Sequence, residues 1–315
     1  MPHITFIHGI CNKPAPDVLI KDWRNALQGD DGIDFSGEGV TSSMVYWADV
    51  LYEKPLAGGA GRESLEGKIE RDSIDQVSMA WRDTIRGEER AFVETLAARL
   101  RFDAAVDEDE APPVEEMGKE FERIPLPGFV KRRIMEAYLR DVHHYLFNVK
   151  FSPRPGTSFR VRDEIRGRLT KALEEGSRQR GPHLLVSHSM GTVISYDCLK
   201  RVPGCPRIDA LLTIGSPLGL DEIQDELKPE GPGQPGWSRT NGFPRGRVNG
   251  TWANIFDALD PVAGFDPHLA NDYQENGLSL VEDIHEANYG KWRHDISKYL
   301  GQPKLRAKMR ALLGL

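Results

Sequence analysis

Short runs of apolar and β-branched residues, each ending at turn residues, recur along the chain and predict buried strands. They lie at residues 4–7, 43–47, 184–187, 211–214 and 251–256, with a last one at 280–284. Between two of them, Val161, Ile165, Leu169 and Leu173 recur every four residues, which predicts a helix packed on a sheet. Alternating strands and helices predict an α/β fold with a doubly wound, mostly parallel sheet, and functional groups at the carboxyl ends of its strands.

The rhythm of strand and helix is interrupted between residues 53 and 150. Apolar residues there have helical spacing at 74–100 and 134–142, with no strand between them and an acidic segment with two prolines at 103–116. We therefore predict an α/β core made of residues 1–52 and 151–315, with a helical insertion at 53–150. The insertion would serve as a lid or cap, or would form a helical side domain without a gating role; the sequence leaves both open.

Composition excludes several classes of protein. The chain has 315 residues, 39% hydrophobic and 28% charged, which suffices for a large core and excludes a disordered tail protein. Its 41 Lys and Arg against 48 Asp and Glu give a net charge of −7, so no basic surplus favours nucleic acid as a partner. No apolar run approaches the roughly 20 residues of a membrane-spanning helix. We expect a soluble protein without a transmembrane segment.

Cysteine usage and the amino terminus bear on the compartment. Three cysteines, Cys11, Cys198 and Cys205, are too few and too odd in number for a disulfide framework. The first residues have neither the basic region nor the apolar region of a secretory signal. Both observations favour a cytoplasmic protein with reduced thiols.

The most informative peptide runs from residue 184 to 194, Leu-Leu-Val-Ser-His-Ser-Met-Gly-Thr-Val-Ile. An apolar strand enters a small-x-Ser-x-Gly turn and leaves it as an apolar helix, which is the context of a nucleophile elbow. Ser189 would occupy the strained corner, with small neighbours at Ser187 and Gly191. Ser187 replaces the first glycine of the usual motif, so its hydroxyl must be accommodated at a close-packed corner.

This peptide resembles the nucleophile elbow of the α/β-hydrolase superfamily, and more narrowly of its lipase-like serine esterases. Three further segments are similar: Ile-Thr-Phe-Ile-His-Gly-Ile at 4–10, Leu-Thr-Ile-Gly-Ser-Pro-Leu at 212–218, and Trp-Ala-Asn-Ile-Phe at 252–256 followed by Asp-Pro-Val-Ala at 260–263. The resemblance implies that the first supplies half of an oxyanion hole and the last carries a catalytic acid. It leaves residues 53–150 unmatched.

A serine hydroxyl is a poor nucleophile at neutral pH and needs a base and an orienting carboxylate. In this fold the order along the chain is Ser, then Asp or Glu, then His. Ser189, Asp260 and His294 follow that order. His294 is preferred because it precedes an expected C-terminal helix and an aromatic residue, Tyr299. The alternatives that remain open are His285 for the base, and Asp257 or Asp266 for the acid.

The resemblance implies a serine carboxylic-ester hydrolase that works through an acyl-enzyme. The backbone N–H groups of Ile10 and Met190 would form the oxyanion hole. We expect a small-molecule ester with an apolar acyl group as substrate, and no metal or other cofactor is indicated. Thioesterase, amidase or phospholipase activity with the same triad, and a non-catalytic binding module of this fold, remain alternatives. The sequence does not indicate the oligomeric state.

Overall fold

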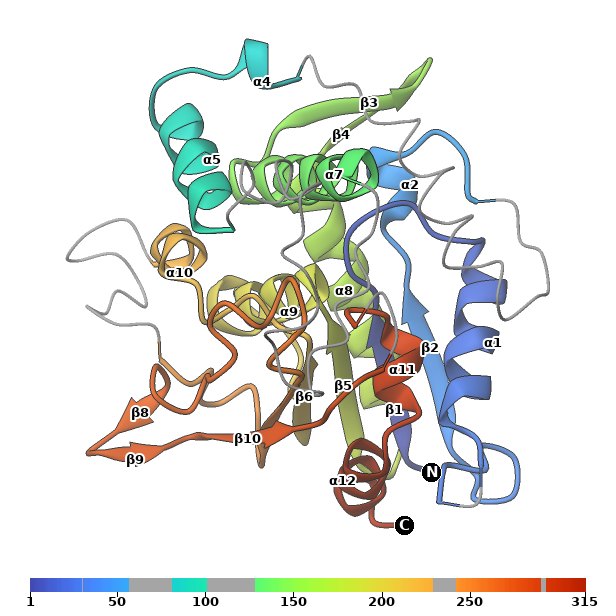
Figure 1. The fold of residues 1–315 in the computed structure, drawn as a ribbon. Coiled ribbons are helices and arrows are strands. Elements are labelled where there is room, and N and C mark those ends of the chain that lie inside the picture. The colour runs from blue at the N-terminus through green and yellow to red at the C-terminus, as the bar shows by residue number, and fades with distance from the viewer. Residues whose placement is uncertain (30, 57–80, 101–127, 229–241, 290–292) are drawn as a thin grey trace, which may run out of the picture.

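A computed structural model describes residues 1–29, 31–56, 81–100, 128–228, 242–289 and 293–315, with the backbone alone at 128–134 (Figure 1). The helical spacing expected at 74–80 and the acidic segment at 103–116 lie outside the described residues.

The centre of the described structure is a sheet of six parallel strands in the order β10-β7-β6-β5-β1-β2. These strands are β1 (His3–Ile7), β2 (Thr41–Val45), β5 (His183–His188), β6 (Ala210–Ile214), β7 (Trp252–Phe256) and β10 (Val281–His285). Each coincides with one of the six apolar runs that predicted a strand. The second strand lies two residues earlier than its run, at 41–45 instead of 43–47, and the N–H of Trp47 donates to the His8 ring, 3.0 Å away.

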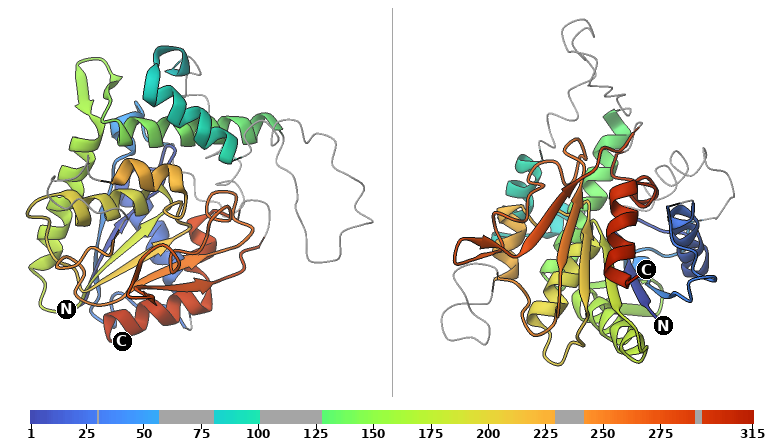
Figure 2. Two further views of the ribbon diagram at one scale, coloured as in Figure 1. Left: turned by 90° about the vertical axis from the view of Figure 1, so that its left-hand side faces the viewer. Right: turned by 90° about the horizontal axis from the view of Figure 1, so that it is seen from below.

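Helices cover both faces of the sheet, as expected for a doubly wound α/β fold (Figure 2). One face carries α1 (Pro16–Leu27), α11 (Ile296–Leu300) and α12 (Pro303–Leu313) over a core that includes Phe6, Val186 and Ile255. The other face carries α8 (Val161–Ser177), α9 (Met190–Arg201) and α10 (Asp221–Leu227). The four residues that predicted a helix at 161–173 are all buried on α8.

The order of the strands reverses beside β1. β1 lies between β2 and β5, so the chain leaves β1 toward one side and reaches β5 on the other. At such a reversal the loops after the two neighbouring strands diverge, and open α/β sheets bind ligands there. The loop after β1 begins at His8, and the turn after β5 contains Ser189.

The described part of residues 53–150 is mainly helical, apart from the irregular residues 53–56 and the turn at 147–149. It contains α4 (Trp81–Thr84), α5 (Gly87–Arg99) and α7 (Gly128–Leu146), and short helix α2 (Ala48–Leu51) precedes it. α7 lies across the carboxyl ends of the strands (Figure 1, Figure 2). Two small hairpins complete the fold, β3 (Lys150–Arg154) with β4 (Thr157–Arg160), and β8 (Gln274–Glu275) with β9 (Leu278–Ser279).

The structure also bears on membrane-spanning helices and on the state of the cysteines. Within the described residues, no helix has both the length and the apolar composition needed to cross a bilayer. Cys11, Cys198 and Cys205 do not form a disulfide among the described residues, and the last two are buried.

Candidate active site

Ser189 lies on a strained corner between β5 and α9. Its φ is +53° and its ψ is −127°, in a region that side-chain-bearing residues rarely adopt and that costs about 1–3 kcal/mol. Its N–H donates to the carbonyl of Ile214 at 2.9 Å, which ties the corner to the end of β6. The strand-turn-helix context predicted for Ser189 is therefore present.

Small residues on either side of Ser189 are explained by close packing. A Cβ on Gly191 would lie 2.8 Å from the carbonyl oxygens of Ile7 and His8, so α9 approaches the end of β1 as closely as backbone permits. Ser187, which replaces the usual glycine, is fully buried, and its hydroxyl lies 2.7 Å from that of Ser195 on α9. That hydrogen bond is how the corner accommodates a serine.

His294 and Asp260 are in direct contact. His294 Nδ1 lies 2.8 Å and 2.9 Å from the two carboxylate oxygens of Asp260, and both side chains are buried. The structure therefore joins the preferred base and the preferred acid of the sequence analysis, which are 34 residues apart.

The surroundings of Asp260 keep it ionised. Burial alone would raise the pKa of its carboxyl, but the His294 charge and hydrogen bond, the Val262 N–H and the Tyr299 hydroxyl outweigh burial and lower the pKa below its usual value. Tyr299 donates to Asp260 at 2.7 Å and accepts the N–H of Asp257 at 2.9 Å. An ionised carboxylate only accepts hydrogen bonds, so Nδ1 of His294 carries the hydrogen that lies toward Asp260.

Two residues close to Ser189 contact His294. The ring of His188, the residue before Ser189, packs on the ring of His294 with centroids 4.7 Å apart, and its Nε2–H donates to the His294 carbonyl at 3.0 Å. Gly215, next to the carbonyl that holds Ser189 N–H, faces His294 so closely that a Cβ there would be 3.2 Å from its Nδ1. Burial lowers the pKa of His188 well below its usual value, so the ring beside His294 is neutral.

Ser189 is fully buried, and its Oγ has no hydrogen-bond partner among the described residues. A Ser189–His294 hydrogen bond is thus not formed in this structure. Such bonds are often long or unformed without substrate and tighten in the Michaelis complex.

The alternative residues lie elsewhere. His285 ends β10 at an exposed position and contacts the Phe256 ring. Asp257 is buried, but its carboxylate accepts the N–H groups of Leu259 and Asn288 and pairs with Arg293 at 3.2 Å. Asp266 is only half-buried. Among the described candidates, His294 and Asp260 are the pair in contact.

The loop after β1 packs against the serine. A Cβ on Gly9 would lie 2.5 Å from Ser189 Cβ and 3.1 Å from its Oγ. His8 Nδ1–H donates to the Gly9 carbonyl at 2.8 Å, and the carbonyl of His8 accepts the Trp47 indole N–H at 2.9 Å. Burial, and then the Lys13 charge, lower the pKa of His8 well below its usual value, so its ring is a neutral structural group. Ile10, which follows Gly9, is buried.

Met190 is the first residue of α9. N–H groups in the first turn of a helix have no carbonyl one turn earlier to donate to, and they lie at the positive end of the helix dipole. The two backbone donors predicted at Ile10 and Met190 thus come from segments that pack together at Ser189. Their role toward an oxyanion stays a prediction.

Sequence reasoning missed two charged residues at this loop. Lys13 donates to the carbonyl of Ile10 at 2.6 Å, and Asp141 of α7 accepts the N–H of Cys11 at 3.0 Å. Asp141 is 130 residues away from Cys11 along the chain, so no local pattern pairs them. Cys11 itself has a φ of +67°, unusual for a residue with a side chain.

Comparison with known proteins gives little. No family model matches the chain, and no curated protein does. Among solved structures, it is similar to an uncharacterized protein from Pseudomonas aeruginosa, with a TM-score of 0.35 and 12% sequence identity. The match covers 99% of this chain and 46% of that chain, so this chain spans less than half the length of its neighbour. A likeness this weak carries no argument about function.

Proposed function

We propose that this chain is a serine carboxylic-ester hydrolase of the α/β-hydrolase type, a lipase-like esterase in which Ser189 is the nucleophile, His294 the base and Asp260 the orienting acid. The observation that carries the proposal is the His294–Asp260 hydrogen bond. The ring of His294 also packs on His188, the residue before Ser189, and lies against Gly215, which follows the carbonyl that accepts the Ser189 N–H. Chain order agrees with this assignment, since the serine comes first and the histidine last.

The reaction follows from these positions. His294 Nε2 takes the Ser189 proton as Oγ attacks the ester carbonyl, and the imidazolium that forms is stabilised by the ionised Asp260. The proton then goes to the leaving alcohol, and water cleaves the acyl-enzyme by the same route in reverse. Tyr299 and the Val262 N–H hold Asp260 in place, so the carboxylate needs no reorganisation when the imidazole becomes charged.

The tetrahedral oxyanion would accept the N–H groups of Ile10 and Met190. One donor of this kind contributes roughly 3 kcal/mol to transition-state stabilisation. Gly9 brings the first loop to the serine without a side chain in the way, and the α9 dipole favours the negative charge.

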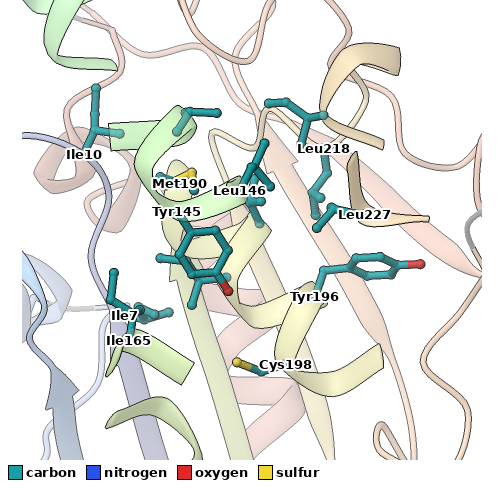
Figure 3. Packing of buried hydrophobic residues seen from close by; sticks show 14 of the residues in the cluster. Ile7, Ile10, Tyr145, Leu146, Ile165, Met190, Tyr196, Cys198, Leu218 and Leu227 are labelled. Carbon is teal, nitrogen blue, oxygen red and sulfur yellow. The ribbon is translucent and has the colours of Figure 1, made fainter. Parts of the chain in front are cut away.

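An apolar acyl group suits the surroundings. Tyr145 and Leu146 of α7 belong to the same hydrophobic cluster as Ile10, Met190 and Leu218 beside the candidate site (Figure 3). A substrate held between α7 and the elbow would meet these apolar side chains. Because Ser189 is fully buried in this conformation, part of the protein around the serine must move before a substrate reaches it.

Labelling with a fluorophosphonate probe tests the proposal. The wild-type protein should be labelled and should hydrolyse short p-nitrophenyl esters, and Ser189→Ala should lose both, with a fall in kcat of at least about 10³-fold. Ser177→Ala is the control: Ser177 is the exposed last residue of α8, and its hydroxyl donates to the Glu174 carbonyl. The control should stay labelled. Intact labelling of Ser189→Ala would overturn the proposal.

The same machinery serves thioesters and amides, so a substrate panel separates the variants of the proposal. Esters, thioesters and anilides with matched acyl chains should be ranked by kcat/KM, with esters expected first. A protein that neither reacts with the probe nor cleaves any of the three would instead be a non-catalytic binding module of this fold.

A further inference from the structure

We propose that Lys13 and Asp141 form a clamp on the Ile10–Cys11 peptide and so act as positioning residues for the oxyanion loop. The inference rests on the proposed function, because it assigns a task to the N–H of Ile10. The two side chains come from different parts of the chain, Lys13 from the loop itself and Asp141 from α7 in the insertion.

Both ends of one peptide unit are held by charged groups. The carbonyl of Ile10 accepts from Lys13 Nζ at 2.6 Å, and the N–H of Cys11, which belongs to the same unit, donates to Asp141 at 3.0 Å. Hydrogen bonds to charged groups are about twice as strong as those between neutral groups. Together they fix the plane of this peptide and hold Cys11 at its positive φ.

The preceding peptide unit is held as well. Its carbonyl, on Gly9, accepts from His8 Nδ1 at 2.8 Å. In a trans peptide the N–H points away from the carbonyl, so this bond aims the N–H of Ile10 at the opposite side. With both planes fixed, neither backbone dihedral of Ile10 is free to turn. Since Asp141 occupies the N–H of Cys11, the proposal assigns the oxyanion to the N–H of Ile10.

Asp141 is itself rigidly placed. Its side chain is fully buried, and it accepts two hydrogen bonds from Arg140 and one from Tyr52, at distances from 2.7 to 3.1 Å. The Arg140 guanidinium also lies over the Tyr52 ring, 4.6 Å from its centre. An ordinary surface carboxylate would not transmit the position of a helix to a loop, but one held by three donors does. The insertion is thereby part of the active-site framework.

The test uses the whole chain with Asp141→Asn and Lys13→Met, one variant for each side of the clamped peptide. An asparagine keeps the size of Asp141 but must turn an NH₂ toward either Arg140 or the Cys11 N–H. Lys13 is half-buried, and methionine retains its apolar stem, so this variant should fold even if the first does not. Glu136→Gln is the matched control, because Glu136 is a buried carboxylate of α7 that pairs with Arg82, away from the loop.

On a short p-nitrophenyl ester, each clamp variant should lower kcat by about 10- to 100-fold while KM changes by less than about threefold, because a misplaced donor is felt in the transition state. Affinity for a boronic acid, which forms a tetrahedral adduct on the serine, should fall in parallel. The double variant should be little worse than the poorer single one, since both act on one peptide. Lys13→Arg should recover most of kcat, and Glu136→Gln should retain it.

The outcomes are separable. If the wild type is inert toward ester and probe, the proposed function fails and the clamp with it. If the wild type is active, the clamp alone is overturned when the clamp variants keep the wild-type kcat, or when KM rises at constant kcat. It is also overturned when the loss of activity matches the loss of folded protein measured by thermal unfolding. The clamp is also overturned if Lys13→Arg recovers kcat and Asp141→Asn keeps the full wild-type kcat. A positive charge near the loop would then be enough for activity, without a hydrogen bond to the Cys11 N–H.

Discussion

Glycines beside the candidate site show how little space separates its parts. A side chain on Gly9 would collide with Ser189, and Gly215, with a φ of +55°, faces both His294 and Asp260. Glycine is required at both positions. Position 9 has no room for a side chain, and position 215 has little room and a backbone conformation that favours glycine.

Gly9→Ala is therefore expected to lower kcat for ester hydrolysis by more than about 100-fold. Its Cβ would lie 2.5 Å from Ser189 Cβ and would push the loop away from the serine. Overpacking should also cost about 1–3 kcal/mol in the free energy of unfolding. Gly167→Ala is the control: nothing lies within 4 Å of a Cβ there, so helix α8 should gain up to about 1 kcal/mol. Urea unfolding and initial rates check both, and an active Gly9→Ala would contradict the close approach.

Tyr299 is expected to matter through Asp260. Tyr299→Phe removes the hydroxyl that donates to Asp260 at 2.7 Å and leaves the buried N–H of Asp257 without its acceptor, which should cost about 1–3 kcal/mol in unfolding free energy. With one hydrogen bond fewer on its carboxylate, Asp260 should hold His294 less firmly, and kcat should fall several-fold. An unchanged unfolding midpoint would show that this hydroxyl is not needed.

At the scale of elements, one buried carboxylate joins three helices on one face of the sheet. Asp197 of α9 accepts the hydroxyl of Tyr145 from α7 at 2.6 Å and two hydrogen bonds of 2.7 Å from Arg166 of α8. Asp197 has no exposed surface. Helix α7 is thus fixed to the core near its carboxyl end and to the β1 loop through Asp141.

Asp197→Ala should lower the free energy of unfolding by about 3–5 kcal/mol, because it leaves the Arg166 guanidinium partly buried without its partner. The comparison is Glu94→Gln on α5, which breaks an ion pair with Arg90 at positions where both side chains are more than half exposed. That change should cost less than about 0.5 kcal/mol. Equal losses from the two variants would argue against the buried anchor.

The elements themselves were largely predictable, because apolar runs and four-residue spacing are local signals. The strand before Ser189, the helix after it and the four buried positions of α8 follow from them. The choice of His294 and Asp260 depended on chain order and a resemblance, and the structure brings that pair into contact. The roles of Lys13 and Asp141 could not be predicted, because charged residues carry no periodic signal and only the folded chain brings α7 to the loop after β1.

For the molecule as a whole, buried histidines set the response to acid. Burial, and then the charge of His3, lower the pKa of His183 to about 4, and burial, Arg140 and His143 lower that of His144 to about 3. His8 and His188 are lowered as well, chiefly by burial. These rings are neutral when folded but take up protons in the unfolded chain at about pH 6.5.

Acid destabilises the folded chain through these histidines. Above about pH 6.5 both states are neutral at these rings, and the stability is complete. As pH falls from about 6.5 toward 4, the unfolded chain binds more protons, and each such histidine removes up to about 1.4 kcal/mol per pH unit from the free energy of unfolding. We expect a steep loss of stability in this window, measured as the urea midpoint against pH. His183→Gln should flatten the slope by about one proton, while His285→Gln, at the exposed end of β10, should leave it as it is. An unaltered slope in His183→Gln would show that this ring is protonated in the folded chain.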